Sequence, residues 1–251
     1  LFCNELIFTN GILEDHIFKC ERKKMKILIC GNLGYIGPVL TKHLKLTIPH
    51  SEITGLDTGY FASRITSSGR IGDTYCNNQI YQDIRDVSFE FLTKFDAVII
   101  LSAISNDPMG KKFENITNKI NYLAVKKIIE PYLKLKNKRL VFASSCSMYG
   151  ASGGEAKKEN DTLNPLTAYS KSKVAVEKAL QKCEFGLDTT ATSLRFATAC
   201  GMSDRLRLDL VLNDFVASAI IRKRIEILSD GTPWRPLIHV KDMARALEWG
   251  I

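Results

Sequence analysis

The chain has 251 residues, of which 45% are hydrophobic and 25% are charged, and its formal net charge is +8. This composition is typical of a globular protein with one large core, and no run of about 18 uncharged apolar residues suggests a membrane span. The positive charge suits anionic ligands such as dinucleotides, but no basic run is longer than residues 22–24, so nucleic acid is not an expected partner.

Strand and helix patterns alternate from Met25 onward. Residues 1–24 show no clear period and are expected to be a non-native or disordered leader. An apolar strand at 26–30 precedes a helix at 38–45 and a second strand at 52–56. The polar segment 58–80 reads as a long loop with room for a short helix. Further elements are predicted at 97–101 (strand), 113–135 (helix interrupted at Pro131), 139–143 (strand), 168–183 (helix), 190–196 (strand), 210–221 (helix) and from 240 (helix).

This alternation predicts an α/β fold, a Rossmann-type doubly wound parallel sheet with helices on both faces. We expect residues 25–197 to form the dinucleotide-binding domain. Residues 198–251 are expected to form part of a small C-terminal substrate-binding lobe, with a segment that returns to the main domain. The helical pattern breaks off at Ile251, so the lobe is expected to be truncated.

A glycine motif follows the first strand and precedes the first helix. Glycines allow a tight turn and a close approach of the backbone to a pyrophosphate, while the helix N-terminus offers free N–H groups. Asp57 ends the second strand 20 residues later, where an acidic residue meets the ribose hydroxyls of the adenosine. Its carboxylate would repel a 2′-phosphate, so NAD is favoured over NADP. The motif comprises Gly31, Asn32, Leu33, Gly34, Tyr35, Ile36 and Gly37.

A second motif pairs Tyr169 with Lys173, four residues apart at the start of a predicted helix and so on one face of it. A tyrosine can accept a proton from a sugar hydroxyl if a nearby ammonium favours tyrosinate. The serine-rich segment 144–150 ends an earlier strand, and the carboxyl ends of parallel strands form the ligand crevice. The sequence therefore predicts hydride and proton transfer on an alcohol.

Together these motifs, in this order and spacing, resemble the extended short-chain dehydrogenase/reductase family, and within it the NAD-dependent nucleotide-sugar epimerase/dehydratase branch. The resemblance implies that Tyr169 is the acid/base, that Lys173 orients the nicotinamide ribose, and that Ser145 binds the reacting hydroxyl. It assigns Arg235 to the substrate diphosphate. Further cofactor positions implied by the resemblance are Asp83 and Ile84 at the adenine, Leu101, Ser102 and Ala103 under the cofactor, Asn121, Ala143 and Phe196.

Three positions depart from the branch pattern. At the positions of Cys146 and Ser147, the family pattern of the dehydratases has an aspartate and a glutamate that remove water. The resemblance therefore disfavours 4,6-dehydration. Thr198 stands where many epimerases have an asparagine that contacts the substrate. We expect all three residues, together with Ser145, to contact the substrate.

Three functions remain open at this stage. The first is an epimerase that returns its hydride, and the second is a dehydrogenase or ketoreductase with net NAD(P)H turnover. The third is a dinucleotide-binding sensor, which is disfavoured because Tyr169 and Lys173 are both present. We also expect a cytoplasmic homodimer, with residues 206–221 and the helix from Phe113 as candidate dimer surfaces. No metal site is expected, since the four histidines show no ligand spacing.

Overall fold

The computed structural model describes residues 24–61, 75–105, 112–150, 156–227, 229–230 and 236–251. The leader predicted at residues 1–24 lies outside these ranges, except for Lys24. None of the helices in the described part has the length and the apolar run that a membrane crossing needs.

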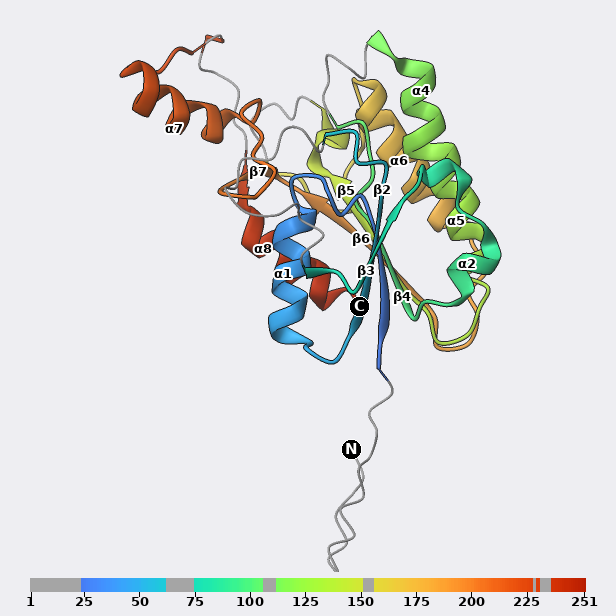
Figure 1. Ribbon diagram of the computed structural model, residues 1–251. Helices are drawn as coiled ribbons and strands as arrows, with labels where there is room; N and C mark the ends of the chain where they lie inside the picture. Colours follow the sequence, from blue (N-terminus) through green and yellow to red (C-terminus); the bar gives the residue numbers. More distant parts are fainter. Residues whose placement is uncertain (1–23, 62–74, 106–111, 151–155, 228, 231–235) are drawn as a thin grey trace, which may run out of the picture.

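A six-stranded parallel sheet with the order β3-β2-β1-β4-β5-β6 forms the centre of the fold (Figure 1). The inner strands β1 and β4 are almost entirely buried, because helices cover both faces. This arrangement confirms the predicted Rossmann-type fold. The strands are β1 (Lys26–Cys30), β2 (Glu52–Asp57), β3 (Asn78–Tyr81), β4 (Ala97–Ile100), β5 (Arg139–Ser145) and β6 (Thr190–Phe196).

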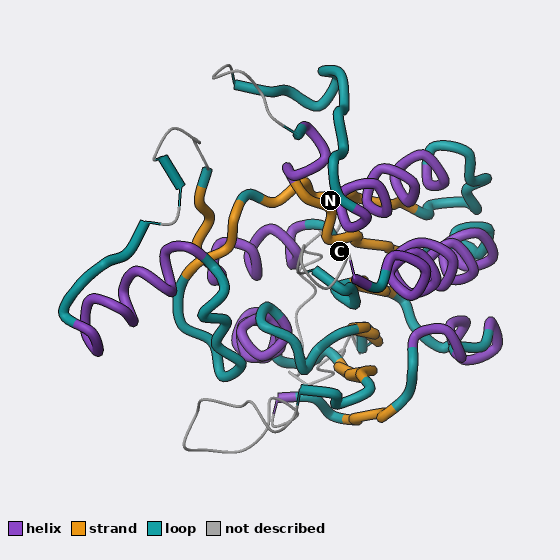
Figure 2. Tube along the Cα trace, turned by 90° about the horizontal axis from the view of Figure 1, so that it is seen from above, coloured by secondary structure: helices purple, strands orange, loops and turns teal. Residues whose placement is uncertain are grey.

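The helices form two layers, one on each side of the sheet (Figures 1 and 2). Helices α1 (Gly37–Thr47) and α8 (Val240–Trp249) lie side by side on one face, where His43 Nε2 and Glu248 Oε2 are 2.6 Å apart. The other layer comprises α2 (Phe89–Thr93), α4 (Glu114–Asn118), α5 (Val125–Tyr132) and α6 (Ala168–Leu180). Each layer packs its own cluster of apolar side chains against the sheet.

Two predictions about these elements were wrong. Residues 78–80 belong to the edge strand β3 and not to a loop, because the polar side chains of Asn78 and Gln79 suit an edge that pairs on one side only. The helix predicted from Phe113 is not interrupted at Pro131. That proline lies inside α5, one residue before the helix ends at Tyr132, and it removes one backbone N–H donor from the last turn.

A π-helical stretch, Lys119–Ala124 (η4), joins α4 to α5. Such wide turns insert one extra residue per turn and occur often at functional sites. Here the stretch contains the buried residue Asn121. No sequence pattern predicted it.

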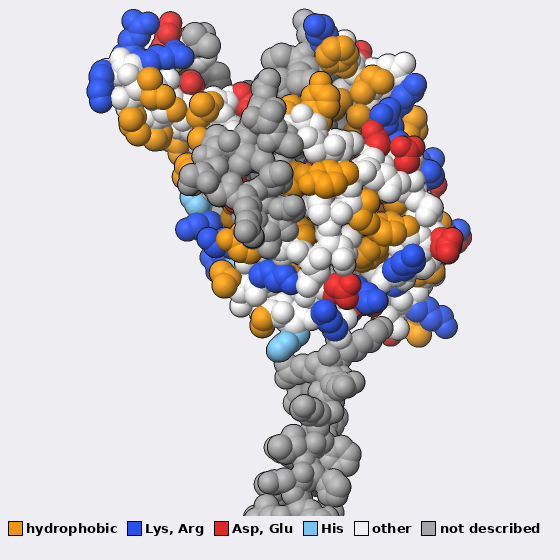
Figure 3. Space-filling view, viewed as in Figure 1, with side chains coloured by type: hydrophobic (Ala, Val, Ile, Leu, Met, Phe, Trp, Pro, Cys, Tyr) orange, Lys and Arg blue, Asp and Glu red, His pale blue; other side chains and the backbone are white. Residues whose placement is uncertain are grey.

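The late part of the chain begins with a small second sheet of two parallel strands, β7 (Thr198–Cys200) and β8 (Leu237–His239). Helix α7 (Val211–Arg222) projects away from the main sheet (Figure 1). Apolar side chains are visible along this helix in Figure 3. Val216 and Ile220 of α7 are 53% and 64% exposed. Helix α8 then returns to the main body beside α1.

Candidate active site

The carboxyl ends of the parallel strands bring the predicted site residues to one edge of the sheet. The glycine turn follows β1, Asp57 ends β2, and the serine segment ends β5. Tyr169 and Lys173 lie in the first two turns of α6, which packs against β5 and the turn that follows it. Residues from four separate segments therefore lie at this edge of the sheet.

The turn between β1 and α1 is as tight as its glycines require. Gly31 has φ +89°, and a Cβ at this position would lie 2.6 Å from the Ser102 nitrogen. A Cβ at Gly37 would lie 2.0 Å from the carbonyl oxygen of Asn32. By contrast, a Cβ at Gly34 would meet only the Gly31 oxygen, at 3.3 Å. Gly31 and Gly37 therefore close the turn, whereas a Cβ at Gly34 would make one tight contact, with the Gly31 oxygen.

The N-terminus of α1 carries no side-chain cap, and Pro38 occupies its first turn. Uncapped N–H groups and the helix dipole favour an anion at such a position. Together with the tight glycine turn, this arrangement fits the pyrophosphate of a dinucleotide.

Asp57 is directly linked to the glycine turn. Its Oδ2 accepts a hydrogen bond from the Leu33 N–H (3.2 Å), and its Oδ1 accepts one from the Gly59 N–H (2.9 Å). Burial raises the pKa of Asp57 above its ordinary value, while these backbone hydrogen bonds oppose the shift. A carboxyl group at the end of β2 and beside the turn has the placement that contact with ribose hydroxyls requires.

The segment after β4 lies against the same turn. The N–H groups of Leu101 and Ser102 both donate to the Cys30 carbonyl oxygen (2.8 and 3.0 Å), and Ala103 follows. Asn121 holds the end of this segment, because its Oδ1 accepts from the Ile104 N–H (2.8 Å) and its Nδ2 donates to the Ile104 carbonyl oxygen (3.0 Å).

Lys173 is buried beside the end of β5. Its Nζ donates to the carbonyl oxygen of Ala143 (2.6 Å) and lies 5.4 Å from the ring centroid of Tyr169 and 4.5 Å from that of Phe142. Burial lowers the pKa of Lys173 to about 7, and the negative charge of Glu177 opposes this shift. The predicted tyrosine–lysine pair is therefore brought together on one face of α6.

The serine segment ends β5 in a short 3₁₀ turn, Cys146–Tyr149 (η5). Ser145 caps this turn, since its Oγ accepts a hydrogen bond from the Ser147 N–H (3.2 Å). The hydroxyl hydrogen of Ser145 is not used in that bond. The Oγ of Ser147 is buried and has no hydrogen-bond partner among the described residues. Two hydroxyls in this turn are thus suited to a polar ligand, and Cys146 lies between them.

Other predicted residues have structural contacts of their own. The Asn32 side chain is fully buried and donates to Gln79 Oε1 (2.6 Å), which joins the glycine turn to β3. Asp83 caps a 3₁₀ turn and pairs with Arg85 (2.8 Å), and Ile84 lies in the core. Phe196, at the end of β6, is also a core residue.

The remaining two predicted substrate residues come from the late part of the chain. Thr198 begins β7, and its N–H donates to the carbonyl oxygen of Pro236 (3.0 Å). Arg235 lies outside the described residues, so its predicted contact with a diphosphate is not placed.

A contact missed by the sequence reasoning joins the glycine turn to the late segments. The hydroxyl of Tyr35 donates to the Gly201 carbonyl oxygen (2.6 Å) and accepts from Asn213 Nδ2 (3.3 Å). The Ser203 hydroxyl donates to the Tyr35 carbonyl oxygen (2.6 Å). These partners lie more than 160 residues from Tyr35 in sequence, so no local pattern could have predicted them.

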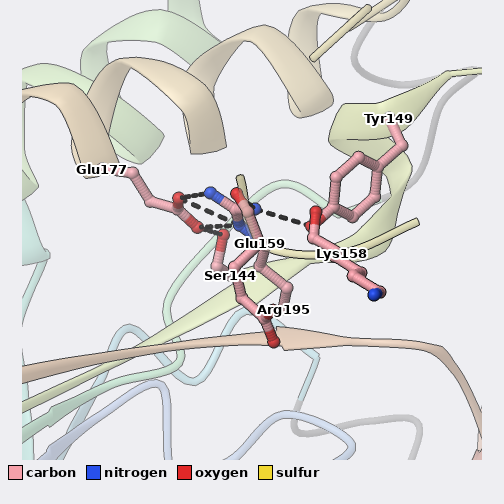
Figure 4. Close-up of polar contacts among 6 residues, drawn as sticks. All are labelled: Ser144, Tyr149, Lys158, Glu159, Glu177 and Arg195. Carbon is pink, nitrogen blue, oxygen red and sulfur yellow. Dashed lines mark hydrogen bonds and ion pairs between the residues drawn. The ribbon is translucent and has the colours of Figure 1, made fainter. Parts of the chain in front are cut away.

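A second missed contact is a buried polar cluster next to the tyrosine–lysine pair (Figure 4). Glu177 Oε1 accepts from the Ser144 hydroxyl at 2.5 Å, and Glu177 Oε2 lies 2.6 Å from Arg195 Nη2. Arg195 Nη1 donates to the hydroxyl of Tyr149 (2.6 Å) and to the carbonyl oxygen of Glu159 (2.8 Å). The spacing of Glu177, four residues after Lys173, was the signal that could have drawn attention to it.

The NAD dependent epimerase/dehydratase family matches residues 27–250. Protein CapI of Staphylococcus aureus is 27% identical over 233 residues, which cover 89% of this chain and 68% of that protein. A UDP-glucose 4-epimerase of Lacticaseibacillus casei is 27% identical over 249 residues, covering 88% and 70%. The structure of MoeE5 in complex with UDP-glucuronic acid and NAD has a TM-score of 0.74 at 25% identity, covering 90% and 71%.

Proposed function

Because this chain belongs to the NAD-dependent epimerase/dehydratase family, we propose that it is a nucleotide-sugar epimerase that inverts one hydroxyl-bearing carbon of the sugar, C4 in the first instance. NAD is the cofactor of the family, and the tight glycine turn, the uncapped N-terminus of α1 and Asp57 fit it.

The observation that carries the proposal is the set of side chains around the tyrosine–lysine pair. Tyr169 and Lys173 lie beside the Ser145 turn, as proton transfer to and from an alcohol requires. Dehydration needs in addition an acid and a base that remove water, and the two residues after Ser145 are Cys146 and Ser147. Neither is a carboxylate, which favours epimerisation over 4,6-dehydration.

In the proposed cycle the C4 hydroxyl of the sugar lies between Ser145 and Tyr169. The Ser145 hydroxyl, whose oxygen already accepts from the Ser147 N–H, donates to the reacting oxygen and orients it. Tyr169 takes the hydroxyl proton while C4 loses a hydride, which leaves a C4 ketone. Bound NAD supplies the hydride acceptor and donor of the cycle. After the keto sugar turns over, a hydride reaches the opposite face of C4 and Tyr169 returns the proton.

Lys173 acts on Tyr169 and on the cofactor ribose in this scheme. Its ammonium lies 5.4 Å from the tyrosine ring, so its charge favours the tyrosinate form.

We further propose that residues 25–197 form the cofactor domain and that residues 198–251 provide part of the sugar site. In that scheme Cys146, Ser147 and Thr198 contact the sugar, and Arg235 binds the diphosphate.

The test combines the protein with a panel of nucleotide hexoses and substoichiometric NAD, and follows the anomeric protons by NMR. A new stereoisomer in large excess over the cofactor is expected, since each cycle returns the hydride. Product limited to the amount of cofactor would replace the epimerase with a net dehydrogenase. Replacement of the starting anomeric signal by that of a dehydrated keto sugar would show that Cys146 and Ser147 do not prevent dehydration.

Tyr169→Phe tests the acid/base directly. Removal of a general acid/base lowers the rate by about 10²–10⁴-fold, so kcat should fall by this factor while NAD binding persists. The matched control is Tyr81→Phe, which changes an exposed tyrosine of the edge strand β3. Equal activity of both variants would exclude Tyr169 as the acid/base.

We also propose a homodimer in which α4, η4 and α5 contribute the interface. Ile116 and Leu123 are 39% and 47% exposed on this continuous helix. Sedimentation equilibrium of the wild type and of Leu123→Glu tests this surface. A wild type that is monomeric at micromolar concentration contradicts it.

A further inference from the structure

The polar cluster around Glu177 has no role in the proposed reaction. It nevertheless connects the two elements that carry the proposed catalytic residues, β5 and α6. Ser144 immediately precedes Ser145 on β5, and Glu177 shares α6 with Tyr169 and Lys173. Arg195 comes from the neighbouring strand β6, where it is the register partner of Ser144. The cluster thus joins the strand that carries the serine to the helix that carries the tyrosine.

The spacing along α6 places the Glu177 carboxylate on the same helix face as Tyr169 and Lys173. Tyr169, Lys173 and Glu177 follow one another at intervals of four residues, so they lie on one face of the helix. Glu177 is therefore one turn from Lys173 and two turns from Tyr169. A side chain in this position can fix the distance between that helix face and the end of β5.

The hydrogen bond from Ser144 sets the direction of its neighbour. Consecutive residues of a strand point to opposite sides, and β5 keeps its register with β6 as far as Ser145. Because the Ser144 hydroxyl is held by Glu177 Oε1 at 2.5 Å, the twist of the strand end is fixed. The direction of the Ser145 side chain is fixed with it.

Arg195 holds the other end of the same turn. Its guanidinium contacts Glu177 through Nε (3.1 Å) and Nη2 (2.6 Å) and donates from Nη1 to the Tyr149 hydroxyl. The Tyr149 hydroxyl in turn donates to the carbonyl oxygen of Lys158 (3.0 Å). Residues 145–148 are consequently bracketed by Ser144 and Tyr149, and both brackets end on the Glu177–Arg195 pair.

The electrostatics favour the same assignment. The Glu177 and Arg195 side chains are only 9% and 17% exposed, and a buried charge of this kind is tolerated when it is paired and hydrogen-bonded. Glu177 also acts on Lys173, because its charge raises the pKa that burial lowers. The carboxylate is thus coupled both to the geometry of the serine turn and to the ammonium beside Tyr169.

We propose that Glu177 and Arg195 are positioning residues, which hold the Ser145–Met148 turn at a fixed place relative to Tyr169 and Lys173. This inference rests on the proposed function, since it concerns the residues that would perform it. It assigns the pair no contact with the substrate.

The test removes the brackets and leaves the buried charges paired. Ser144→Ala deletes one hydroxyl, and Tyr149→Phe deletes the other while keeping the ring. Each should lower kcat by about tenfold and change KM for the nucleotide sugar by less than about twofold, because a small misplacement of reacting groups affects the transition state more than binding. The double variant should lose less than the product of the two single losses, since both act through one pair.

The matched control is Ser51→Ala. Ser51 is 1% exposed and its hydroxyl makes one hydrogen bond, to the Ile48 carbonyl oxygen (2.8 Å), at the opposite edge of the sheet from the site. It reports what the loss of a buried hydroxyl does to stability alone. A kcat for Ser144→Ala and Tyr149→Phe equal to that of Ser51→Ala would overturn the proposal.

A second readout keeps the inference separate from the proposed function. In hydrogen–deuterium exchange of the NAD-loaded protein, Ser144→Ala should speed the exchange of amides 145–149 and leave those of α1 unchanged. This result is expected even if no nucleotide sugar is epimerised, which would refute only the proposed function. Unchanged exchange at 145–149 would refute the positioning role, whatever the wild-type activity.

Discussion

Lys173 carries its charge in a place where a charge is costly, and we predict that Lys173→Met stabilises the NAD-free protein at low pH. The side chain is 3% exposed, and its Nζ donates to the Ala143 carbonyl oxygen. Burial lowers the pKa of Lys173 from 10.5 to about 7. Methionine has a similar length and no charge, so it removes the penalty and retains most of the apolar contact.

The direction of the pH dependence follows from proton binding. An unfolded chain keeps the lysine proton up to its ordinary pKa of about 10.4, whereas the folded protein releases it near a pKa of about 7. Between these values the unfolded state binds more protons, so the stability of the wild type rises with pH. The penalty is fully present below pH 7 and is gone near pH 10.5.

The magnitude can be worked from the same values. At about 1.4 kcal/mol for each pH unit between them, the penalty on the ammonium is about 5 kcal/mol. Methionine leaves the Ala143 carbonyl oxygen without its donor, which costs about 1–3 kcal/mol. We therefore expect Lys173→Met to be more stable than the wild type by about 3 kcal/mol at pH 6, and less stable by about 1–2 kcal/mol at pH 10.

Urea unfolding followed by circular dichroism at pH 6 and pH 10 measures these differences. The matched control is Lys171→Met, which changes an exposed lysine of the same helix and should show no such reversal of sign. A difference in unfolding free energy between wild type and Lys173→Met that is the same at both pH values would refute the reasoning. In the proposed reaction the same variant should be inactive, so stability and activity would change in opposite directions.

Two further predictions concern the cofactor turn. Gly37→Ala would place a Cβ 2.0 Å from the Asn32 carbonyl oxygen and should lower the unfolding free energy by more than about 2 kcal/mol. Gly34→Ala, whose Cβ meets only the Gly31 oxygen at 3.3 Å, should lower the unfolding free energy less than Gly37→Ala does and should reduce NAD affinity. Calorimetric unfolding and titration with NAD separate the two effects. Asp57→Asn removes the charge that would repel a 2′-phosphate and should raise the affinity for NADP relative to NAD, as measured by titration with each cofactor; an unchanged ratio would place the adenosine ribose away from this side chain.

The fold was predictable from the sequence where the signal was local. The apolar run at Lys26–Cys30, the glycines and the following helix lie within some twenty residues, so their pattern identified β1, the turn and α1 together. Edge strand β3 was not predictable, because its residues are polar and become a strand only through pairing with β2. The π-helical stretch depends in the same way on packing rather than on local preference.

The same distinction between local patterns and long-range contacts applies to the residues of the candidate site. Tyr169, Lys173 and Ser145 could be found from spacing and from their place at strand and helix ends, and the structure brings them to one edge of the sheet. The spacing of Glu177 after Lys173 was a signal for that residue, but its contact with Arg195 could not be predicted, because a single charge on a helix or strand resembles a solvent-exposed one until its partner is known. Their contact joins residues 18 positions apart and depends on the pairing of β5 with β6.

The packing of α1 against α8 has a consequence for synthesis on the ribosome. Leu40 and Leu44 of α1 are fully buried in a cluster that includes Met243 and Leu247 of α8, and the hydrogen bond between His43 and Glu248 of the two helices spans 205 positions. The part of the α1 face that packs against α8 therefore has no partner while the intervening residues are made, about 10–40 s at elongation rates of about 5–20 residues per second. During this interval that face of α1 is open to chaperones, and α8 completes the layer that α1 began.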